Sequence, residues 1–122
     1  MENIIKFIKE CKEFWVNTVS ENEPNSRPFG AISTDGKYLF IATSKLKNVY
    51  NEIINNPNIM ISCLKAGTRD WLRINCNASI SNDRKDKELL FNDFPILYQR
   101  YNGLDDPNLI IFKLEVLKYS RY

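Results

Sequence analysis

The segment from Trp71 to Ser81 alternates between apolar and polar side chains over its whole length. This period of two is typical of a β-strand that buries one face in a core and leaves the other face polar. Such a strand needs partner strands, because one strand alone satisfies neither its backbone nor its apolar face. Its expected inward residues are Leu72, Ile74, Cys76, Ala78 and Ile80, and its expected outward residues are Trp71, Arg73, Asn75, Asn77 and Ser79.

The rest of the chain alternates between strand-like and helix-like patterns. The expected strands are Phe14–Val19, Arg27–Thr34, Lys37–Thr43, Asn58–Lys65 and Leu109–Tyr119, and the expected helices are Asn3–Lys12, Leu46–Asn55, Asp83–Phe91 and Pro95–Tyr101. Glu21 to Asn25 predicts a turn, Asp35-Gly36 predicts a two-residue hairpin turn, and Asn3 and either Asn82 or Asp83 are expected N-caps. These six strands show no βαβ rhythm, which predicts a mainly β antiparallel barrel or sandwich with the 46–55 helix over one mouth.

Size and charge limit the class of protein and its partners. A chain of 122 residues predicts one domain over residues 1–122. The formal net charge of +2 does not indicate binding to nucleic acid or to an anionic membrane. No apolar run approaches the roughly 18 residues of a membrane span, and no signal-peptide pattern opens the chain, so we expect a cytoplasmic protein. Hydrophobic residues make up 43% of the sequence, which is enough for one packed core but leaves few residues to enclose a large ligand. A large ligand is therefore expected to bind between two subunits.

Histidine is absent from the sequence, and this excludes several kinds of catalytic site. Ser-His-Asp and Cys-His catalysis and histidine metal sites all require that residue. The three cysteines, Cys11, Cys63 and Cys76, lack the spacing of a metal site, so we expect buried free thiols and no metal. No catalytic residue is identified by pattern.

Hydroxyl, amide and cationic side chains gather between the strand that ends at Thr43 and the helix that follows. Thr43 and Ser44 can donate hydrogen bonds from their hydroxyls, Lys47 supplies a charge, and Asn48 can donate from its amide. A helix start also attracts anions, so these residues predict a phosphate site. The competing interpretation is a helix capped by Ser or Thr, with its lysines in solvent.

Two further clusters suggest contact with a flat, polar ligand. In the run Arg27-Pro28-Phe29-Gly30, the guanidinium suits a phosphate or a ring carbonyl and Gly30 allows close approach of a ligand. Trp71 and Arg73 share the polar face of one strand, which suits a heterocycle with carbonyl oxygens. The alternatives are an irregular edge strand for the first cluster and a dimer interface for the second.

In the order and spacing of its motifs, the chain resembles the pyridoxamine 5'-phosphate oxidase-like FMN-binding split barrels, in particular their short general-stress or nitroimidazole-reductase-like branch. The motifs are Arg27-Pro28-Phe29-Gly30, Asp35-Gly36, Ala42-Thr43-Ser44, Lys47-Asn48-Val49-Tyr50, Asn56-Pro57 and Trp71-Leu72-Arg73. The resemblance implies a six-stranded antiparallel split β-barrel of Greek-key order and a homodimer with FMN at its interface. It implies that Thr43, Ser44, Lys47 and Asn48 hold the phosphate, that Arg27, Pro28, Phe29 and Gly30 run beside the ribityl chain and ring, and that Trp71 and Arg73 line the cleft.

The resemblance leaves alternatives for the cofactor and the activity. Related barrels bind F420 or haem, and members that oxidise pyridoxamine 5'-phosphate carry a C-terminal segment with Trp and Arg that this chain does not show. That oxidation is therefore not expected. The favoured hypothesis is a small FMN-dependent oxidoreductase that acts on a small molecule with a nicotinamide or other reductant. The alternatives are a flavin-binding stress-response or redox-sensing module without turnover, and a dimeric barrel without flavin.

Overall fold

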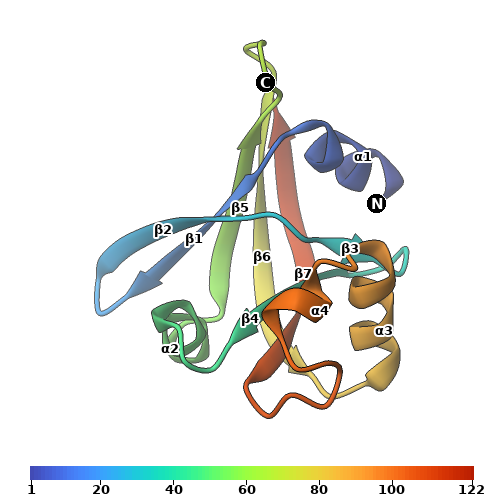
Figure 1. Ribbon diagram of the computed structural model, residues 1–122. Coiled ribbons are helices and arrows are strands. Elements are labelled where there is room, and N and C mark those ends of the chain that lie inside the picture. The colour runs from blue at the N-terminus through green and yellow to red at the C-terminus, as the bar shows by residue number, and fades with distance from the viewer.

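Seven antiparallel strands form one sheet in the computed structural model, which describes residues 1–122 (Figure 1). Along the sheet the strands follow the order β2-β1-β5-β6-β7-β4-β3. In this order β5, β6, β7 and β4 make a Greek key, as expected. The strands are β1 (Phe14–Ser20), β2 (Glu23–Phe29), β3 (Ser33–Thr34), β4 (Leu39–Ser44), β5 (Asn58–Leu64), β6 (Trp71–Ser81) and β7 (Leu109–Arg121).

The sheet has to curl because its two outermost strands are neighbours along the chain. Only Gly30–Ile32 joins β2 to β3, and a three-residue connection spans about 14 Å at most. In a flat sheet of seven strands the outer two would lie about 29 Å apart. Figure 1 shows the chain passing from β2 to β3 across the sheet. The result is the antiparallel split barrel that the sequence predicts.

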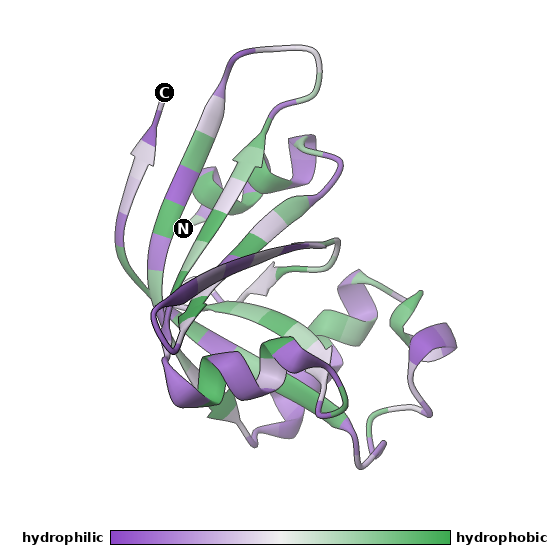
Figure 2. Cartoon of the chain, turned by 90° about the vertical axis from the view of Figure 1, so that its left-hand side faces the viewer, coloured by the Kyte–Doolittle hydropathy of each residue, from purple (hydrophilic) through white to green (hydrophobic).

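Strand β6 has the predicted bounds, and its alternation places Leu72, Ile74, Cys76 and Ala78 in the core. Figure 2 shows the same alternation of hydrophobic and hydrophilic residues along the strands. Ile80 is an exception, since it is 38% exposed although the pattern predicts it to be inward. The main core cluster ends on this strand at Ala78, so Ile80 lies beyond the elements that would cover it.

The sheet packs on two separate cores. The larger core fills the barrel and includes Ile110, Phe112 and Leu114 of β7. The smaller core covers the opposite face of β7, so that four successive residues from Leu109 to Phe112 are buried. It is closed by α3 (Arg84–Asp93) and α4 (Leu97–Arg100), which contribute Leu90, Phe91 and Leu97.

The other helices differ from the predictions mainly at their starts. Helix α1 (Glu2–Glu10) begins after Met1, so the expected cap Asn3 lies inside the helix. Helix α2 (Asn48–Asn55) begins later than predicted. Its first expected residues form a turn, in which Ser44 Oγ accepts a hydrogen bond from the backbone of Leu46 at 3.1 Å. Asp83 caps α3 as expected, by accepting from Lys85 N at 2.9 Å.

The predicted strand 27–34 is two strands in the structure, which changes the strand count from six to seven, and the predicted turn Glu21–Asn25 is shorter because β2 already begins at Glu23. The first part of the predicted strand belongs to β2, which pairs with β1 through a tight turn at Glu21 and Asn22, both with positive φ. Its last two residues form β3. The Asp35-Gly36 turn also spans four residues, because Asp35 Oδ1 accepts from the backbones of both Lys37 and Tyr38.

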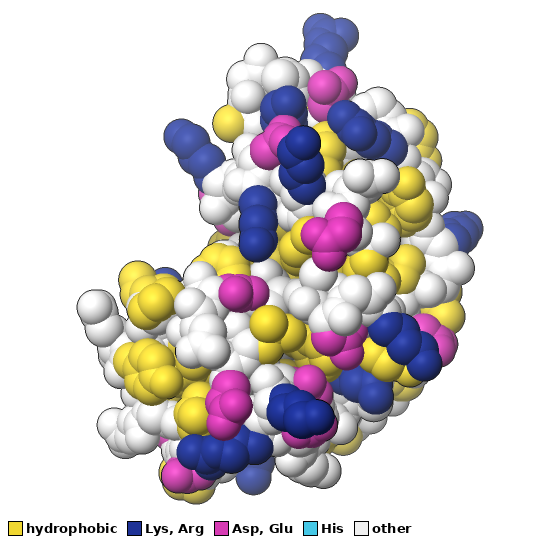
Figure 3. All heavy atoms as spheres, turned by 90° about the vertical axis from the view of Figure 1, so that its right-hand side faces the viewer, with side chains coloured by type: hydrophobic (Ala, Val, Ile, Leu, Met, Phe, Trp, Pro, Cys, Tyr) yellow, Lys and Arg dark blue, Asp and Glu magenta, His cyan; other side chains and the backbone are white.

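The cysteines, the lengths of the helices and the surface charges can be compared with the sequence-based expectations. Cys11, Cys63 and Cys76 are buried free thiols, as expected. None of the four helices has the length and apolar character needed to cross a membrane. On the face shown in Figure 3, charges of both signs are interspersed and no large patch of one sign forms.

The closure of the barrel by Gly30–Ile32 can be tested by truncating Ile32, which is 1% exposed and lies in the main core. We expect Ile32→Ala to lower the free energy of unfolding by about 2–5 kcal/mol, since it leaves a cavity where the sheet edges meet. Ile80→Ala is the matched control and should cost about 1 kcal/mol or less. Urea denaturation measures both variants, and equal losses would contradict this role of the connection.

Candidate functional site

A cavity of about 1120 Å³ lies where β4 ends and α2 begins. Sites for small molecules and cofactors typically enclose on the order of 300–1,000 Å³, so this cavity is of the size that a nucleotide-like ligand requires. We call it the Thr43 cavity. Its walls are formed by Arg27, Pro28, Phe29, Gly30 and Ala31; by Ala42, Thr43, Ser44, Leu46, Lys47 and Val49; by Leu97, Arg100, Tyr101, Asp106 and Asn108; and by Glu13 and Trp15.

Thr43 is the most informative residue of this cavity. Its side chain is 2% exposed, and its Oγ1 atom is the buried side-chain polar atom that has no hydrogen-bond partner. Leaving a buried hydroxyl unpaired costs roughly 1–3 kcal/mol. Thr43 is also one of the residues that line the cavity, so this unpaired hydroxyl lies next to the space available to a ligand.

The start of α2 provides positive charge beside Thr43. No side chain caps this helix, so the partial positive charge of its first backbone N–H groups is not neutralised. Lys47 immediately precedes it, lines the cavity and takes part in no ion pair. Ser44 also lines the cavity, whereas Asn48, expected at the same site, does not. Thr43, Ser44 and Lys47 are therefore brought together as the sequence predicts.

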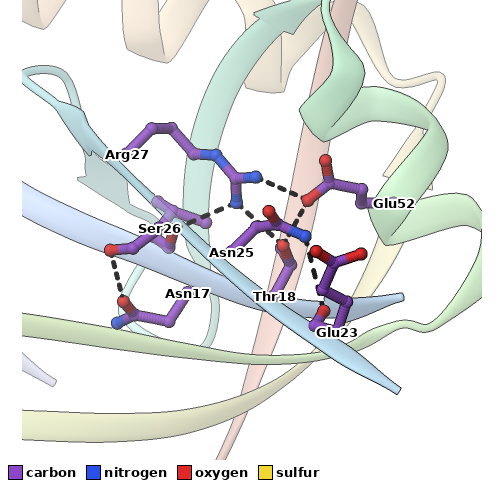
Figure 4. A network of polar contacts seen from close by, with 8 residues as sticks. Asn17, Thr18, Glu23, Asn25, Ser26, Arg27 and Glu52 are labelled. Atoms are coloured by element: carbon purple, nitrogen blue, oxygen red, sulfur yellow. Dashed lines mark hydrogen bonds and ion pairs between the residues drawn. The ribbon is translucent and has the colours of Figure 1, made fainter. Parts of the chain in front are cut away.

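Arg27 lines the cavity, but its guanidinium is engaged in a polar network between β1, β2 and α2 (Figure 4). Nη2 contacts Glu52 Oε1 at 2.5 Å, and Nη1 donates to Thr18 Oγ1 at 2.9 Å and to the Val16 carbonyl at 3.1 Å. Thr18 in turn donates to Glu52 Oε1 at 2.6 Å. Burial by itself would raise the pKa of Glu52, but the hydrogen bonds from Thr18 and Arg27 outweigh it and hold that pKa below its ordinary value.

Pro28, Phe29 and Gly30 form the neighbouring wall. A Cβ atom built on Gly30 would meet no atom within 4 Å, and the backbone of Gly30 has no positive φ. Neither packing nor backbone conformation therefore requires glycine at this position. Glycine here leaves room over the backbone on the side of the cavity.

Trp71 and Arg73 lie outside the Thr43 cavity. Trp71 stacks on Tyr122 with ring centroids 4.3 Å apart, and Arg73 Nη2 donates to the Tyr122 hydroxyl at 2.9 Å. Trp71 also lines a second hollow of about 540 Å³, which we call the Trp71 hollow. That hollow shares Glu13 and Trp15 with the Thr43 cavity and is otherwise lined by Lys12, Ser62, Cys63, Leu64 and Ala66.

The wall formed by α4 and the following loop was not predicted from the sequence. Arg100 is exposed there and has no ion pair, and burial raises the pKa of Tyr101. Backbone hydrogen bonds from Asn102 and Asn108 lower the pKa of Asp106. This segment reaches the site because β7 pairs with β4 and Lys45 N donates to the Asn108 carbonyl at 2.9 Å. No local sequence pattern marks that long-range contact.

Comparison with known proteins gives a family and close structural relatives. The family model described as pyridoxamine 5'-phosphate oxidase matches residues 1–120. General stress protein 26 of Bacillus subtilis (strain 168) is 31% identical over 102 residues, which cover 80% of this chain and 70% of that protein. The crystal structure of a NimC/NimA family protein from Clostridium acetobutylicum is 26% identical, has a TM-score of 0.85, and covers 100% of this chain and 90% of that chain.

Two other solved structures share the fold at lower identity. One is an F420 reductase that is 18% identical with a TM-score of 0.70, covering 94% of each chain. The other is HutZ, the haem storage protein from Vibrio cholerae, which is 17% identical with a TM-score of 0.76 and covers 99% of this chain and 92% of its own. These likenesses concern the fold alone.

The polar network of Arg27 and Glu52 predicts a pH-dependent stability. Glu52→Gln keeps the size of the side chain but removes its charge, so at pH 7 we expect a loss of about 1–3 kcal/mol in the free energy of unfolding. Because the pKa of Glu52 is lower in the folded chain, its stabilising effect is present above the ordinary value of 4.5 and is lost as the pH falls through the lowered value. The difference between the two proteins should therefore shrink in acid.

Urea denaturation at neutral and acidic pH measures this difference. Glu23→Gln, which changes an exposed carboxylate on β2 without an ion pair, is the control and should leave the free energy of unfolding almost unchanged at pH 7. A difference between Glu52→Gln and the wild-type chain that does not vary with pH would contradict an ionised, paired Glu52.

Proposed function

Because this chain belongs to the pyridoxamine 5'-phosphate oxidase family, as its motifs predict, we propose that it is a flavoprotein that binds FMN in the Thr43 cavity and acts as a small flavin-dependent oxidoreductase. The single observation that carries this proposal is the buried, unpartnered hydroxyl of Thr43 in the cavity wall. An unpaired hydroxyl in that position lowers the stability of the ligand-free chain, and an anionic ligand could accept the missing hydrogen bond.

The phosphate of FMN fits the residues at the start of α2. Thr43 would donate its hydroxyl hydrogen, Lys47 would supply a full positive charge, and the uncapped helix end would add backbone donors. Ser44 Oγ already accepts from Leu46 N, which leaves its own hydrogen free to donate. Asn48 starts the helix, and its role would be through its backbone. These groups together would offset much of the negative charge of a phosphate.

The ribityl chain and ring would lie along Pro28, Phe29 and Gly30. The open space over Gly30 supports this placement, because a ligand can approach the backbone there. Arg27 would hold this wall in place through Glu52 and can add a donor at its exposed edge. When bound, the flavin supplies hydride or single-electron transfer, and the protein needs only to orient the ring and to give the substrate access to it. This chemistry does not require a histidine as acid or base, which agrees with the absence of histidine from the chain.

FMN is favoured over haem by the donor set of the cavity. Haem iron takes an axial ligand such as His, Cys, Met or Tyr. Of these residue types only Tyr101 lines the cavity, and burial raises its pKa, which disfavours the phenolate ligand. F420 shares a flat ring and a phosphate with FMN, so the binding experiment below includes it.

We also propose a homodimer, with Trp71 and Arg73 as part of its interface near the cofactor. The outer face of β1, β5 and β6 exposes Trp15 (41%), Leu64 (54%) and, beside Trp71, Tyr122 (52%), and no helix of the chain covers these residues. Apolar side chains gathered on one sheet face are typical of an interaction surface. The three buried free thiols support a reducing, cytoplasmic location as part of the same proposal.

The dimer can be tested at Leu64. We expect the wild-type chain to be dimeric in light scattering, and Leu64→Glu to shift it toward the monomer because it places charge in an apolar interface. Ile54→Glu is the control, since Ile54 is 49% exposed on α2, away from this face. A wild-type chain that is monomeric with FMN bound would refute the interface.

The proposed function is tested by titrating the chain with FMN, riboflavin, F420 and haem. We expect FMN to bind tightly, and Thr43→Val to weaken FMN by roughly 10- to 100-fold while changing riboflavin by about twofold at most, because only FMN carries the phosphate. Thr43→Val should also leave the free energy of unfolding of the ligand-free chain equal or higher, by up to about 1 kcal/mol, because it removes an unpaired hydroxyl.

Lys47→Ala should discriminate FMN from riboflavin in the same direction, whereas Lys37→Ala, on the distant loop between β3 and β4, should not. Equal weakening of both flavins by Thr43→Val would show that Thr43 does not contact the phosphate. Stopped-flow reduction of the loaded protein by NADH and NADPH then separates an oxidoreductase from a flavin-binding module without turnover. A chain that binds none of the four ligands would refute the proposal.

A further inference from the structure

Trp15 lies where the Thr43 cavity and the Trp71 hollow meet, since it lines both. We infer that the indole of Trp15 is the aromatic surface on which the flat ring of the bound cofactor rests. This inference rests on the proposed function and names a residue that the sequence did not identify as part of the site. It replaces Trp71 of the same chain in that role.

The pairing of β1 with β2 places Trp15 beside Pro28 of the cavity wall. Trp15 lies opposite Pro28 in this antiparallel ladder, so the two side chains project from the same face of the sheet. Arg27 lies opposite Val16 and projects from the other face, where it contacts Glu52. The ring-side residue Pro28 is therefore the cross-strand neighbour of the indole.

Within one chain the indole of Trp15 has no aromatic partner, so it can receive a ring at the proposed dimer interface. It is 41% exposed and takes part in none of the aromatic pairs of the chain. An indole offers a flat, electron-rich face on which an electron-poor heterocycle stacks favourably. A half-exposed indole at the mouth of a cavity is thus a better platform than one that already has a partner.

Trp71 of the same chain already has such a partner. Its indole stacks on Tyr122 at an angle of 16°, and the two backbones exchange hydrogen bonds of 2.8 and 3.3 Å. Arg73 holds the Tyr122 hydroxyl from the next strand position on the same face. Trp71 does not line the cavity that contains Thr43 and Lys47.

The charges of the cavity support the same orientation of the ligand. Lys47 lies at the α2 wall, whereas Glu13, two residues before Trp15, lies at the wall shared with the Trp71 hollow. Arg27 is paired with Glu52. Arg100 and Asp106, which are opposite in charge, both belong to the wall formed by α4 and the loop after it. An anionic phosphate is attracted by the α2 wall and repelled by the wall with Glu13. The uncharged ring is therefore left to the side of Trp15.

The experiment compares the emission of FMN bound to Trp15→Leu and to Trp71→Leu, so that each of the two tryptophans of the chain is removed in turn. An indole in van der Waals contact with a flavin quenches its fluorescence by transferring an electron to the excited ring. FMN bound to the wild-type chain should therefore show almost no fluorescence. We expect Trp15→Leu to restore emission of the bound flavin and to weaken FMN binding by roughly 5- to 150-fold, the range for loss of one aromatic stacking partner. Trp71→Leu should leave bound FMN dark.

Trp15→Phe keeps an aromatic ring for stacking but lacks the readily oxidised indole, so it should restore emission while weakening FMN binding less than Trp15→Leu. It also covers the case of a Trp15→Leu chain that does not fold. Bound FMN that stays dark in Trp15→Leu or in Trp15→Phe, or that brightens equally in Trp71→Leu, would overturn the inference while leaving FMN binding intact. A wild-type chain that does not bind FMN at all would refute the proposed function and this inference together.

Discussion

The connection of β2 to β3 through Gly30–Ile32 is the constraint on which the rest of the structure depends. Because it joins strands from opposite ends of the sheet order, it forces the sheet to curl, and the interior of that curl receives the buried side chain of Ile32. The same connection supplies Gly30 and Ala31 to the wall of the Thr43 cavity. Closure of the barrel and formation of the site therefore arise from one short segment.

The ion pair between Arg27 and Glu52 ties the second part of the site to this frame. Helix α2 buries only Val49 and Ile53 in the core, which leaves its rotation and tilt weakly determined by packing. The side chain of Glu52 adds a directional contact from the middle of the helix to β2 and β1 through Arg27 and Thr18. The positive end of the helix is thereby fixed relative to Pro28 and Gly30 on the wall beside it.

The sequence predicted those parts of the fold that rest on local patterns. Strand β6 alternates strictly and was placed at its observed bounds, and the cluster of Thr43, Ser44 and Lys47 was recognised because its members are close in sequence. The division of residues 27–34 between β2 and β3 was missed, because both pieces are extended and their different partners are distant. The α4 wall and Trp15 were missed for the same reason, since they reach the site only through pairing across the sheet.

In the proposed function, Thr43 would bind the ligand from a regular position on strand β4. On β4 the inward positions Leu39 and Ile41 are both fully buried and apolar, and Thr43 continues the same alternation as a hydroxyl. A valine would have the same shape there and would not leave a polar atom unpaired. A buried hydroxyl that the chain itself does not satisfy lowers stability, and a ligand that accepts a hydrogen bond from it would remove that cost. An anion would suit this place better than a neutral ligand, because Lys47 and the uncapped start of α2 both follow Thr43 closely along the chain and add positive charge there.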